Sequence, residues 1–143
     1  MASKASAVWT GSLKEGKGTI STATGVLHGA TYSFATRFEG AATGTTPEEL
    51  IAAAHASCYS MALSALLGAA GLTPYSIETS VLVTLGKVDT GFAITRIALT
   101  TTGNVPGATK EVFEQAAADA KEGCPVSKLF ANNTEITLQA KLV

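Results

Sequence analysis

The chain has little charge and few aromatic residues. Only 15% of its 143 residues are charged and 6% are aromatic, whereas about 25% of a typical soluble domain is charged. Hydrophobic residues make up 46% of the chain, and alanine is prominent among them. Such a composition is the opposite of that of disordered chains. The sequence therefore predicts one folded domain over residues 1–143, because this length suits a single domain with its own core.

An excess of positive charge is also absent. Ten Lys and Arg residues stand against eleven Asp and Glu residues, which gives a formal net charge of −1. Without a basic field the chain lacks the electrostatic footprint of a nucleic-acid-binding protein, so we expect no nucleic-acid partner. Residues 1–12 contain no apolar stretch of secretory length, and we therefore expect a cytoplasmic location.

One long uncharged run, residues 50–72, has the length of a transmembrane helix. It is rich in alanine, however, and it contains histidine, serine and glycine. Neither flank carries the cluster of Lys and Arg that sets the orientation of a membrane span. We therefore predict a buried helix inside a soluble protein, with no membrane partner.

The start of this helix has a clear sequence signature. Thr46 is a good N-cap, Pro47 suits the first helical position, and Glu48 and Glu49 suit the positive end of the helix dipole. Glu49 also completes a capping-box pattern with Thr46. The helix is expected to continue to Gly71.

Patterns on both sides of the helix indicate β-structure. Alternating runs predict an N-terminal antiparallel meander, and later runs predict a hairpin and a closing strand with two further helices before it. The result is an α+β domain in which antiparallel sheets pack on a long central helix. The expected strands are 6–13, 18–22, 31–38, 77–85, 92–102 and 134–142, and the two further helices are 109–122 and 124–130.

The chain has only two cysteines, Cys58 and Cys124, and they form no C-x-x-C motif. A structural disulfide is not expected in a cytosolic domain of this size. Buried, inert thiols are one interpretation. A zinc site that adds His28 and His55 is another, but no recognised ligand spacing supports it.

Local reasoning ranks Cys124 as the more reactive thiol. It lies between Gly123 and Pro125, at the predicted start of a short helix. A thiol there faces unpaired amide groups and the positive end of a dipole, which favour the thiolate. Cys58 lies in the middle of the long helix and lacks this help.

The only two arginines are Arg37 and Arg96. Arg96 alternates with threonine and is predicted to lie on a solvated strand face. Arg37 lies shortly before the acidic helix start, and a guanidinium near a thiol stabilises the thiolate while a carboxylate can hold the guanidinium in place. A surface salt bridge is the competing interpretation. His55, three residues before Cys58, is interpreted as a core histidine rather than a base.

Taken together, these motifs resemble the OsmC family of osmotically inducible, peroxiredoxin-like peroxidases. The position of Arg37 is similar to that in the OsmC branch, because in the sister organic hydroperoxide resistance branch the arginine lies nearer the N-terminus. The resemblance covers nearly the whole chain and is carried by Trp9-Thr10-Gly11, Gly25-Val26-Leu27, Thr36-Arg37-Phe38-Glu39-Gly40, Thr46-Pro47-Glu48-Glu49-Leu50, Ala54-His55-Ala56-Ser57-Cys58, residues 87–95 and Gly123-Cys124-Pro125-Val126-Ser127.

The resemblance implies a cysteine-based peroxidase that reduces organic hydroperoxides. Cys58 would attack the peroxide and become a sulfenic acid, and Cys124 would then form a disulfide with it. Arg37 would stabilise the thiolate and orient the peroxide, Glu48 would hold Arg37, and Glu49 would share that role. No metal or other cofactor is implied, and an external dithiol or a lipoylated protein would reduce the disulfide. The ranking of the cysteines is thereby reversed.

The resemblance also implies an intertwined homodimer with active sites at the subunit interface. Helix geometry adds a hypothesis of its own, because Glu48 and Cys58 are about 15 Å apart along one helix axis and cannot touch. Alanines on the Cys58 side of the helix would let a second helix approach closely. We therefore predict a composite site to which the partner chain contributes Arg37 or Glu48. A non-enzymatic binder of apolar ligands and a general thiol–disulfide reductase remain the alternative functions.

Overall fold

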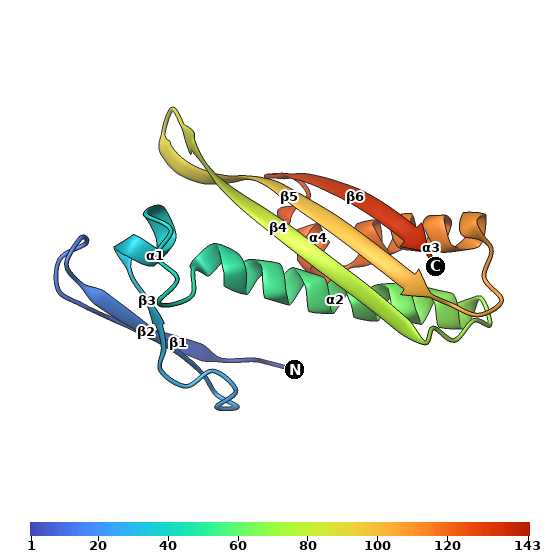
Figure 1. The fold of residues 1–143 in the computed structure, drawn as a ribbon, viewed down its shortest axis with the longest axis horizontal. Helices are drawn as coiled ribbons and strands as arrows, with labels where there is room; N and C mark the ends of the chain where they lie inside the picture. The colour runs from blue at the N-terminus through green and yellow to red at the C-terminus, as the bar shows by residue number, and fades with distance from the viewer. The chain divides into compact units, whose positions relative to one another are not determined.

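The computed structural model describes all 143 residues and divides into two compact units, Met1–Leu50 and Ile51–Val143. Each unit contains its own three-stranded sheet (Figure 1). The mixed composition of helices and sheets confirms the predicted α+β class.

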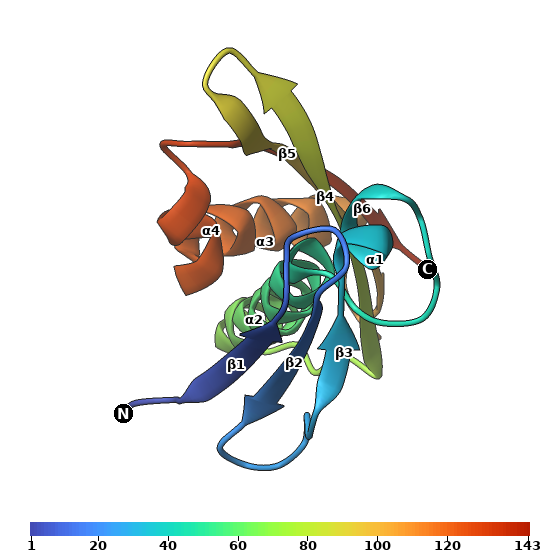
Figure 2. The same ribbon diagram turned by 90° about the vertical axis from the view of Figure 1, so that its left-hand side faces the viewer.

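The first unit holds the predicted N-terminal meander. Strands β1 (Ala5–Thr10), β2 (Lys17–Thr22) and β3 (Ala30–Tyr32) pair antiparallel in the order β1-β2-β3. The predicted strand 31–38 is wrong beyond Tyr32, because the chain turns there into a short helix, α1 (Phe34–Phe38). Figure 2 shows α1 following directly from the end of β3.

The long helix α2 (Pro47–Ala69) begins at the predicted residue. The backbone N–H of Glu49 donates to the Thr46 hydroxyl at 3.0 Å, as expected of an N-cap. Gly71, with φ of 76°, follows its end. Every fourth residue from His55 to Leu67 is fully buried, so one side of the helix belongs to a hydrophobic core.

Helix α2 is also the one helix whose length and mean hydropathy, 1.6, would fit a membrane span. Within the protein, 22% of that stretch is buried. Its buried side chains Tyr59, Leu63 and Leu67 pack in one cluster with Leu99 and Phe113 of the second unit.

The second unit is built on a mixed sheet. Strands β4 (Ser76–Val88) and β5 (Gly91–Asn104) form a long antiparallel hairpin, and β6 (Glu135–Leu142) pairs parallel to β5. The prediction of wholly antiparallel sheets is therefore wrong for this last pair. The physical reason is the crossover through α3 (Lys110–Gly123) and α4 (Pro125–Phe130), which returns the chain to the end of the sheet from which β5 started.

Helices α2 and α3 cover one face of this sheet (Figure 1). The core between them contains, fully or almost fully buried, Tyr59, Leu63, Leu67, Leu99, Val105, Phe113, Ala117, Ala120 and Cys124. Cys124 is thus a core residue as well as a candidate functional one.

Candidate active site

Arg37 is presented by the short helix α1. Ser33 caps this helix in a complete capping box, because its hydroxyl accepts from the N–H of Thr36 and the Thr36 hydroxyl accepts from the N–H of Ser33. The Thr36 side chain is also within 3.1 Å of the Thr45 carbonyl oxygen. The Ser33–Thr36 spacing was the signal that distinguishes this segment from a strand.

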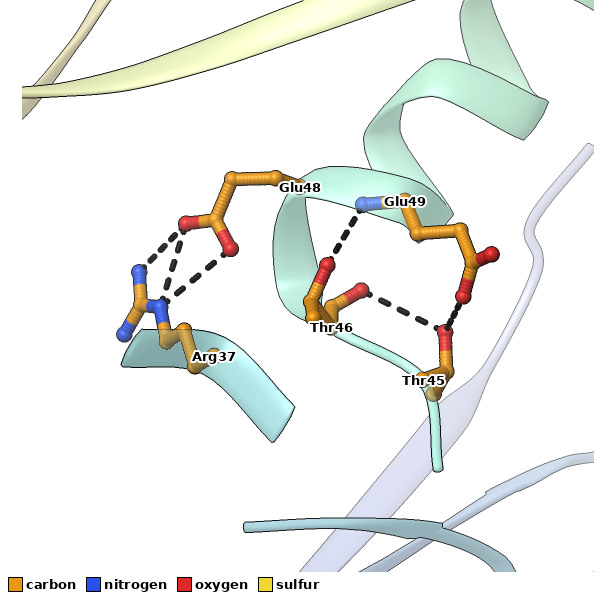
Figure 3. Close-up of polar contacts among 5 residues, drawn as sticks. All are labelled: Arg37, Thr45, Thr46, Glu48 and Glu49. Carbon is orange, nitrogen blue, oxygen red and sulfur yellow. Dashed lines mark hydrogen bonds and ion pairs between the residues drawn. The ribbon is translucent and has the colours of Figure 1, made fainter. Parts of the chain in front are cut away.

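The Arg37 guanidinium is held by Glu48, at the start of α2 (Figure 3). Arg37 Nη2 lies 2.6 Å from Glu48 Oε1, and Arg37 Nε lies 3.1 and 3.3 Å from the two carboxylate oxygens. The Phe38 ring lies under the guanidinium, with Cζ 5.4 Å from the ring centroid. The Glu48 side chain is only 11% exposed, so this contact is better fixed than an ordinary surface salt bridge.

Glu49 has a different partner from Glu48. Its carboxylate accepts a hydrogen bond from the Thr45 hydroxyl (Figure 3), and its contact with the Arg37 guanidinium is not formed. The predicted capping box is therefore only half present, because the Thr46 hydroxyl accepts from the Glu49 N–H while the Glu49 carboxylate turns to Thr45. Of the two acidic residues, Glu48 is the one that orients Arg37.

In the second unit the two cysteines are neighbours. Cys58, on α2, and Cys124, immediately before α4, are free thiols packed at the same core, close enough for the Cys124 thiol to affect the pKa of Cys58. Cys124 is fully buried, whereas Cys58 is partly exposed. Only the exposed one of the two is accessible to a substrate.

Burial raises the pKa of the Cys58 thiol, and the adjacent Cys124 thiol raises it further. The backbone N–H of Val126, at the N-terminal end of α4, donates to Cys58 and partly offsets this increase in pKa. Within its own unit, Cys58 is therefore held as the neutral thiol. A positive charge from elsewhere is needed to make it a thiolate at neutral pH.

The prediction that Cys124 caps a short helix is confirmed for the backbone only. Cys124 is the N-cap residue of α4 and Pro125 is its first residue, but the Cys124 side chain makes no capping hydrogen bond. The amide that sequence reasoning assigned to Cys124 goes to Cys58 instead. The ranking of the two thiols from local sequence missed the interaction of Cys58 with the Val126 amide, because the two residues are far apart in the chain.

Arg96 and His55, the other charged or polar candidates, make contacts that belong to the strand surface and to the core. Arg96 is exposed and lies 3.7 Å from Glu135 on the neighbouring strand, as predicted for a solvated strand face. His55 is fully buried and its Nε2 lies 2.7 Å from the Ser127 hydroxyl, while its Nδ1 has no partner. Burial lowers the pKa of His55. No three His, Cys, Asp or Glu side chains are close enough together to ligate a metal ion.

Tyr59, next to Cys58 in sequence, also lies near the second thiol. Its buried hydroxyl donates to the Ala117 carbonyl oxygen at 3.0 Å, and burial together with nearby Cys124 raises the pKa of the Tyr59 hydroxyl. Tyr59 therefore stays neutral and packs beside Cys124 as part of the core.

Sequence comparisons relate the chain to OsmC-like proteins. Residues 40–139 match the family of OsmC-like proteins. Over 139 residues the chain is 55% identical to the peroxiredoxin OsmC of Escherichia coli. This alignment covers 97% of this chain and 95% of that protein. It is 32% identical over 100 residues to the organic hydroperoxide resistance protein OhrB of Bacillus subtilis, covering 69% of this chain and 71% of that protein.

Solved structures show the same fold. The crystal structure of Bacillus subtilis OhrB matches with a TM-score of 0.73 at 27% identity, over 96% of this chain and 97% of that chain. An OsmC-like protein from Mycoplasma pneumoniae matches with a TM-score of 0.78 at 17% identity, over 100% of this chain and 98% of that one. At this lower identity the likeness concerns the fold alone.

Proposed function

Because the chain belongs to the family of OsmC-like proteins, we propose that it is a thiol-dependent peroxidase that reduces organic hydroperoxides to alcohols. The identity with a peroxiredoxin over nearly the whole chain supports this activity. The observation that carries the proposal is the contact between the partly exposed Cys58 and the buried Cys124. Two thiols held together in this way suit a nucleophile and its resolving partner.

In the first step, the Cys58 thiolate attacks the terminal oxygen of the hydroperoxide. The O–O bond breaks, the alkoxide takes up a proton and leaves as the alcohol, and Cys58 becomes a sulfenic acid. In the second step, the sulfur of Cys124 attacks the sulfur of Cys58. The S–O bond breaks, and hydroxide leaves with the Cys124 proton as water, so that a disulfide remains.

Arg37 has the chemistry to activate Cys58. The second unit holds this thiol neutral, so the first step requires a nearby cation. Arg37 is the arginine whose guanidinium is already aligned, by Glu48 and by the Phe38 ring. In the proposed site Arg37 stabilises the thiolate and binds the peroxide oxygens, Glu48 orients Arg37, and Glu49 supports the start of α2.

The proposed active form is a homodimer with composite sites. Glu48 and Cys58 lie about 15 Å apart along α2, so they cannot act together on one helix. Ala54, Ala65 and Ala69, on the Cys58 side of α2, are exposed and would let a second copy of the helix approach closely. We infer that one chain contributes Cys58 and Cys124 and that its partner contributes Arg37 together with Glu48, since the two are paired within one chain. In such a dimer the two units of each chain would act as one OsmC-like domain.

The proposed cycle ends when an external dithiol, such as a lipoylated protein, reduces the Cys58–Cys124 disulfide. The chemistry needs no further cofactor, and hydrogen peroxide is expected to be a weaker substrate than organic hydroperoxides. With this activity, the proposed role of the protein is protection of the cytoplasm against oxidative and osmotic stress.

The test is a peroxidase assay with cumene hydroperoxide, tert-butyl hydroperoxide and hydrogen peroxide, with dithiothreitol as the reductant. Replacement of the nucleophile in Cys58→Ser should abolish hydroperoxide consumption, a loss on the order of a thousandfold or more. Cys124→Ser should retain the first turnover but lose the disulfide and accumulate over-oxidised Cys58, visible by mass spectrometry.

The same assay separates the alternative functions. A binder of apolar ligands would consume no hydroperoxide, and a general thiol–disulfide reductase would reduce disulfide substrates with no preference for organic hydroperoxides. Consumption of cumene hydroperoxide by Cys58→Ser at the wild-type rate would refute the proposed role of Cys58.

A further inference from the structure

A buried hydrogen bond joins α2 to α4 beside the two cysteines. His55 Nε2 lies 2.7 Å from Ser127 Oγ, and the two residues are 0% and 2% exposed. They are 72 positions apart in the chain, so this is a tertiary contact. The two chemical steps described above do not use it.

The spacing of this contact matches that of the thiols. His55 lies three residues before Cys58 on α2, and Ser127 lies three residues after Cys124 on α4. Residues three apart lie on the same side of a helix, nearly one turn from each other. The His55–Ser127 and Cys58–Cys124 contacts are therefore two successive rungs between α2 and α4, which run antiparallel at this point.

The unpaired Nδ1 indicates the direction of the hydrogen bond. A proton on Nδ1 would bury an N–H group without an acceptor, whereas a proton on Nε2 leaves only an unused lone pair at Nδ1. Nε2–H therefore donates to the Ser127 hydroxyl. Because both groups are removed from water, separation of α4 from α2 would leave both unsatisfied.

Helix α4 is anchored at its start to α3, where the Cys124 N–H donates to the Ala120 carbonyl oxygen, and the His55–Ser127 contact is the side-chain hydrogen bond that ties it to α2. It is only six residues long, and the side chain of its N-cap residue, Cys124, makes no capping hydrogen bond. A disulfide requires Cα atoms about 4.4–6.8 Å apart and a narrow range of dihedral angles. A small rotation or shift of α4 along α2 would take Cys124 outside that range.

We propose that the His55–Ser127 hydrogen bond is a positioning device that holds Cys124 in register with Cys58 for disulfide formation. Its catalytic consequence rests on the proposed function, because the bond would accelerate the attack of the Cys124 sulfur on the Cys58 sulfenic acid. Its effect on the equilibrium between the dithiol and the disulfide does not depend on any peroxidase activity.

The first experiment measures that equilibrium in the full-length protein with dithiothreitol redox buffers. Ser127→Ala should lower the effective concentration of Cys124 at Cys58 about tenfold, which raises the two-electron potential of the pair by about 30 mV. His55→Leu removes the same hydrogen bond and also the ring contact with Phe130, so it should raise the potential at least as much. The double variant should lose no more than His55→Leu alone, because the hydrogen bond is already absent in that variant.

Conservative variants and a matched control separate positioning from general destabilisation. Ser127→Thr keeps the hydroxyl and His55→Gln keeps an N–H donor, so both should retain a potential close to the wild-type value. The control is Ser57→Ala on α2, the helix that carries His55. The Ser57 hydroxyl is exposed and donates to the Ala54 carbonyl oxygen at 3.0 Å. It should leave the potential unchanged.

The second experiment follows one equivalent of cumene hydroperoxide by rapid quenching and mass spectrometry. In Ser127→Ala, hydroperoxide consumption should keep its rate, disulfide formation should slow about tenfold, and over-oxidised Cys58 should increase. A wild-type potential together with a wild-type rate of disulfide formation in Ser127→Ala would overturn the proposal. So would equal losses in Ser127→Ala and Ser57→Ala. If the wild-type protein consumed no hydroperoxide, the proposed function would fail, whereas the potentials would still decide this inference.

Discussion

The two units prepare opposite kinds of chemistry. In the first unit, Arg37 of the short capped helix α1 and the largely buried Glu48 of α2 form a charged pair with three close N–O contacts. In the second, Cys58 and Cys124 form a neutral pair against a hydrophobic core, where burial raises the pKa of Cys58. The cation and the nucleophile thus belong to different units of the chain.

Under the proposed function, this contrast would keep Cys58 unreactive until Arg37 comes near it. A thiol that its own unit holds neutral reacts slowly with peroxide, because the thiolate is the nucleophile. A guanidinium already oriented by a carboxylate can activate that thiol without reorganisation once the two groups meet. Variants of Arg37 and Glu48 test whether the two clusters depend on each other in this way.

Removal of the cation should have the largest effect. Arg37→Ala should slow the reaction with cumene hydroperoxide about a hundredfold at pH 7, because the thiolate loses its stabilising charge. Without Arg37, the pKa of Cys58 should stay raised as it is in its own unit, so a higher pH is needed for the same fraction of thiolate. The rate–pH profile of the variant should therefore move to higher pH, as measured by stopped-flow kinetics between pH 5 and pH 10.

The matched control is Arg96→Ala, which removes the other arginine from an exposed strand. It should leave both the rate and its pH profile unchanged. A pH profile of Arg37→Ala identical to that of the wild-type protein would show that the two clusters work independently.

Loss of the carboxylate that orients Arg37 should have a smaller effect. Glu48→Gln preserves size but removes the ion pair, so the rate should fall roughly tenfold. Glu49→Gln should cost less, because its carboxylate accepts from Thr45 rather than from the guanidinium. Steady-state kinetics of the two variants rank the acidic residues, and a larger loss in Glu49→Gln would contradict the arrangement in Figure 3.

The smallest effect concerns stability rather than rate. Because burial lowers the pKa of His55, the unfolded chain binds a proton there more readily than the folded protein does. The free energy of unfolding should therefore decrease as the pH falls below about 6.5, by at most about 1.4 kcal/mol per pH unit from this group. His55→Gln should remove this contribution to the slope in chemical denaturation between pH 8 and pH 5.

The exposed His28 provides the control for that measurement. His28→Gln makes the same replacement at an exposed position, and its slope is the reference for the slope of His55→Gln. An unchanged slope in His55→Gln would show that the buried imidazole does not couple protonation to folding.

Much of the local structure was predictable because its causes are local. Thr46 and Pro47 mark the start of α2, Thr109 caps α3, and Cys124 with Pro125 begins α4. The segment after Tyr32 was not predicted correctly, because its aromatic and β-branched residues suit a strand and the Ser33–Thr36 capping box overrides that preference. The parallel pairing of β6 with β5 was also missed, since a pattern of alternation does not reveal which strand lies beside which.

The sequence by itself determined most of the elements, the two thiols and the acidic start of the long helix, because helix caps and alternation act over a few residues. It also carried the resemblance to the OsmC family in motifs that span the chain. Only the tertiary structure decided that Glu48 rather than Glu49 holds Arg37, and that the free amide of α4 goes to Cys58 rather than to Cys124. Only there, too, do His55 and Ser127 meet. These outcomes depend on contacts between segments far apart in the chain, where packing selects one partner from several that are chemically equivalent.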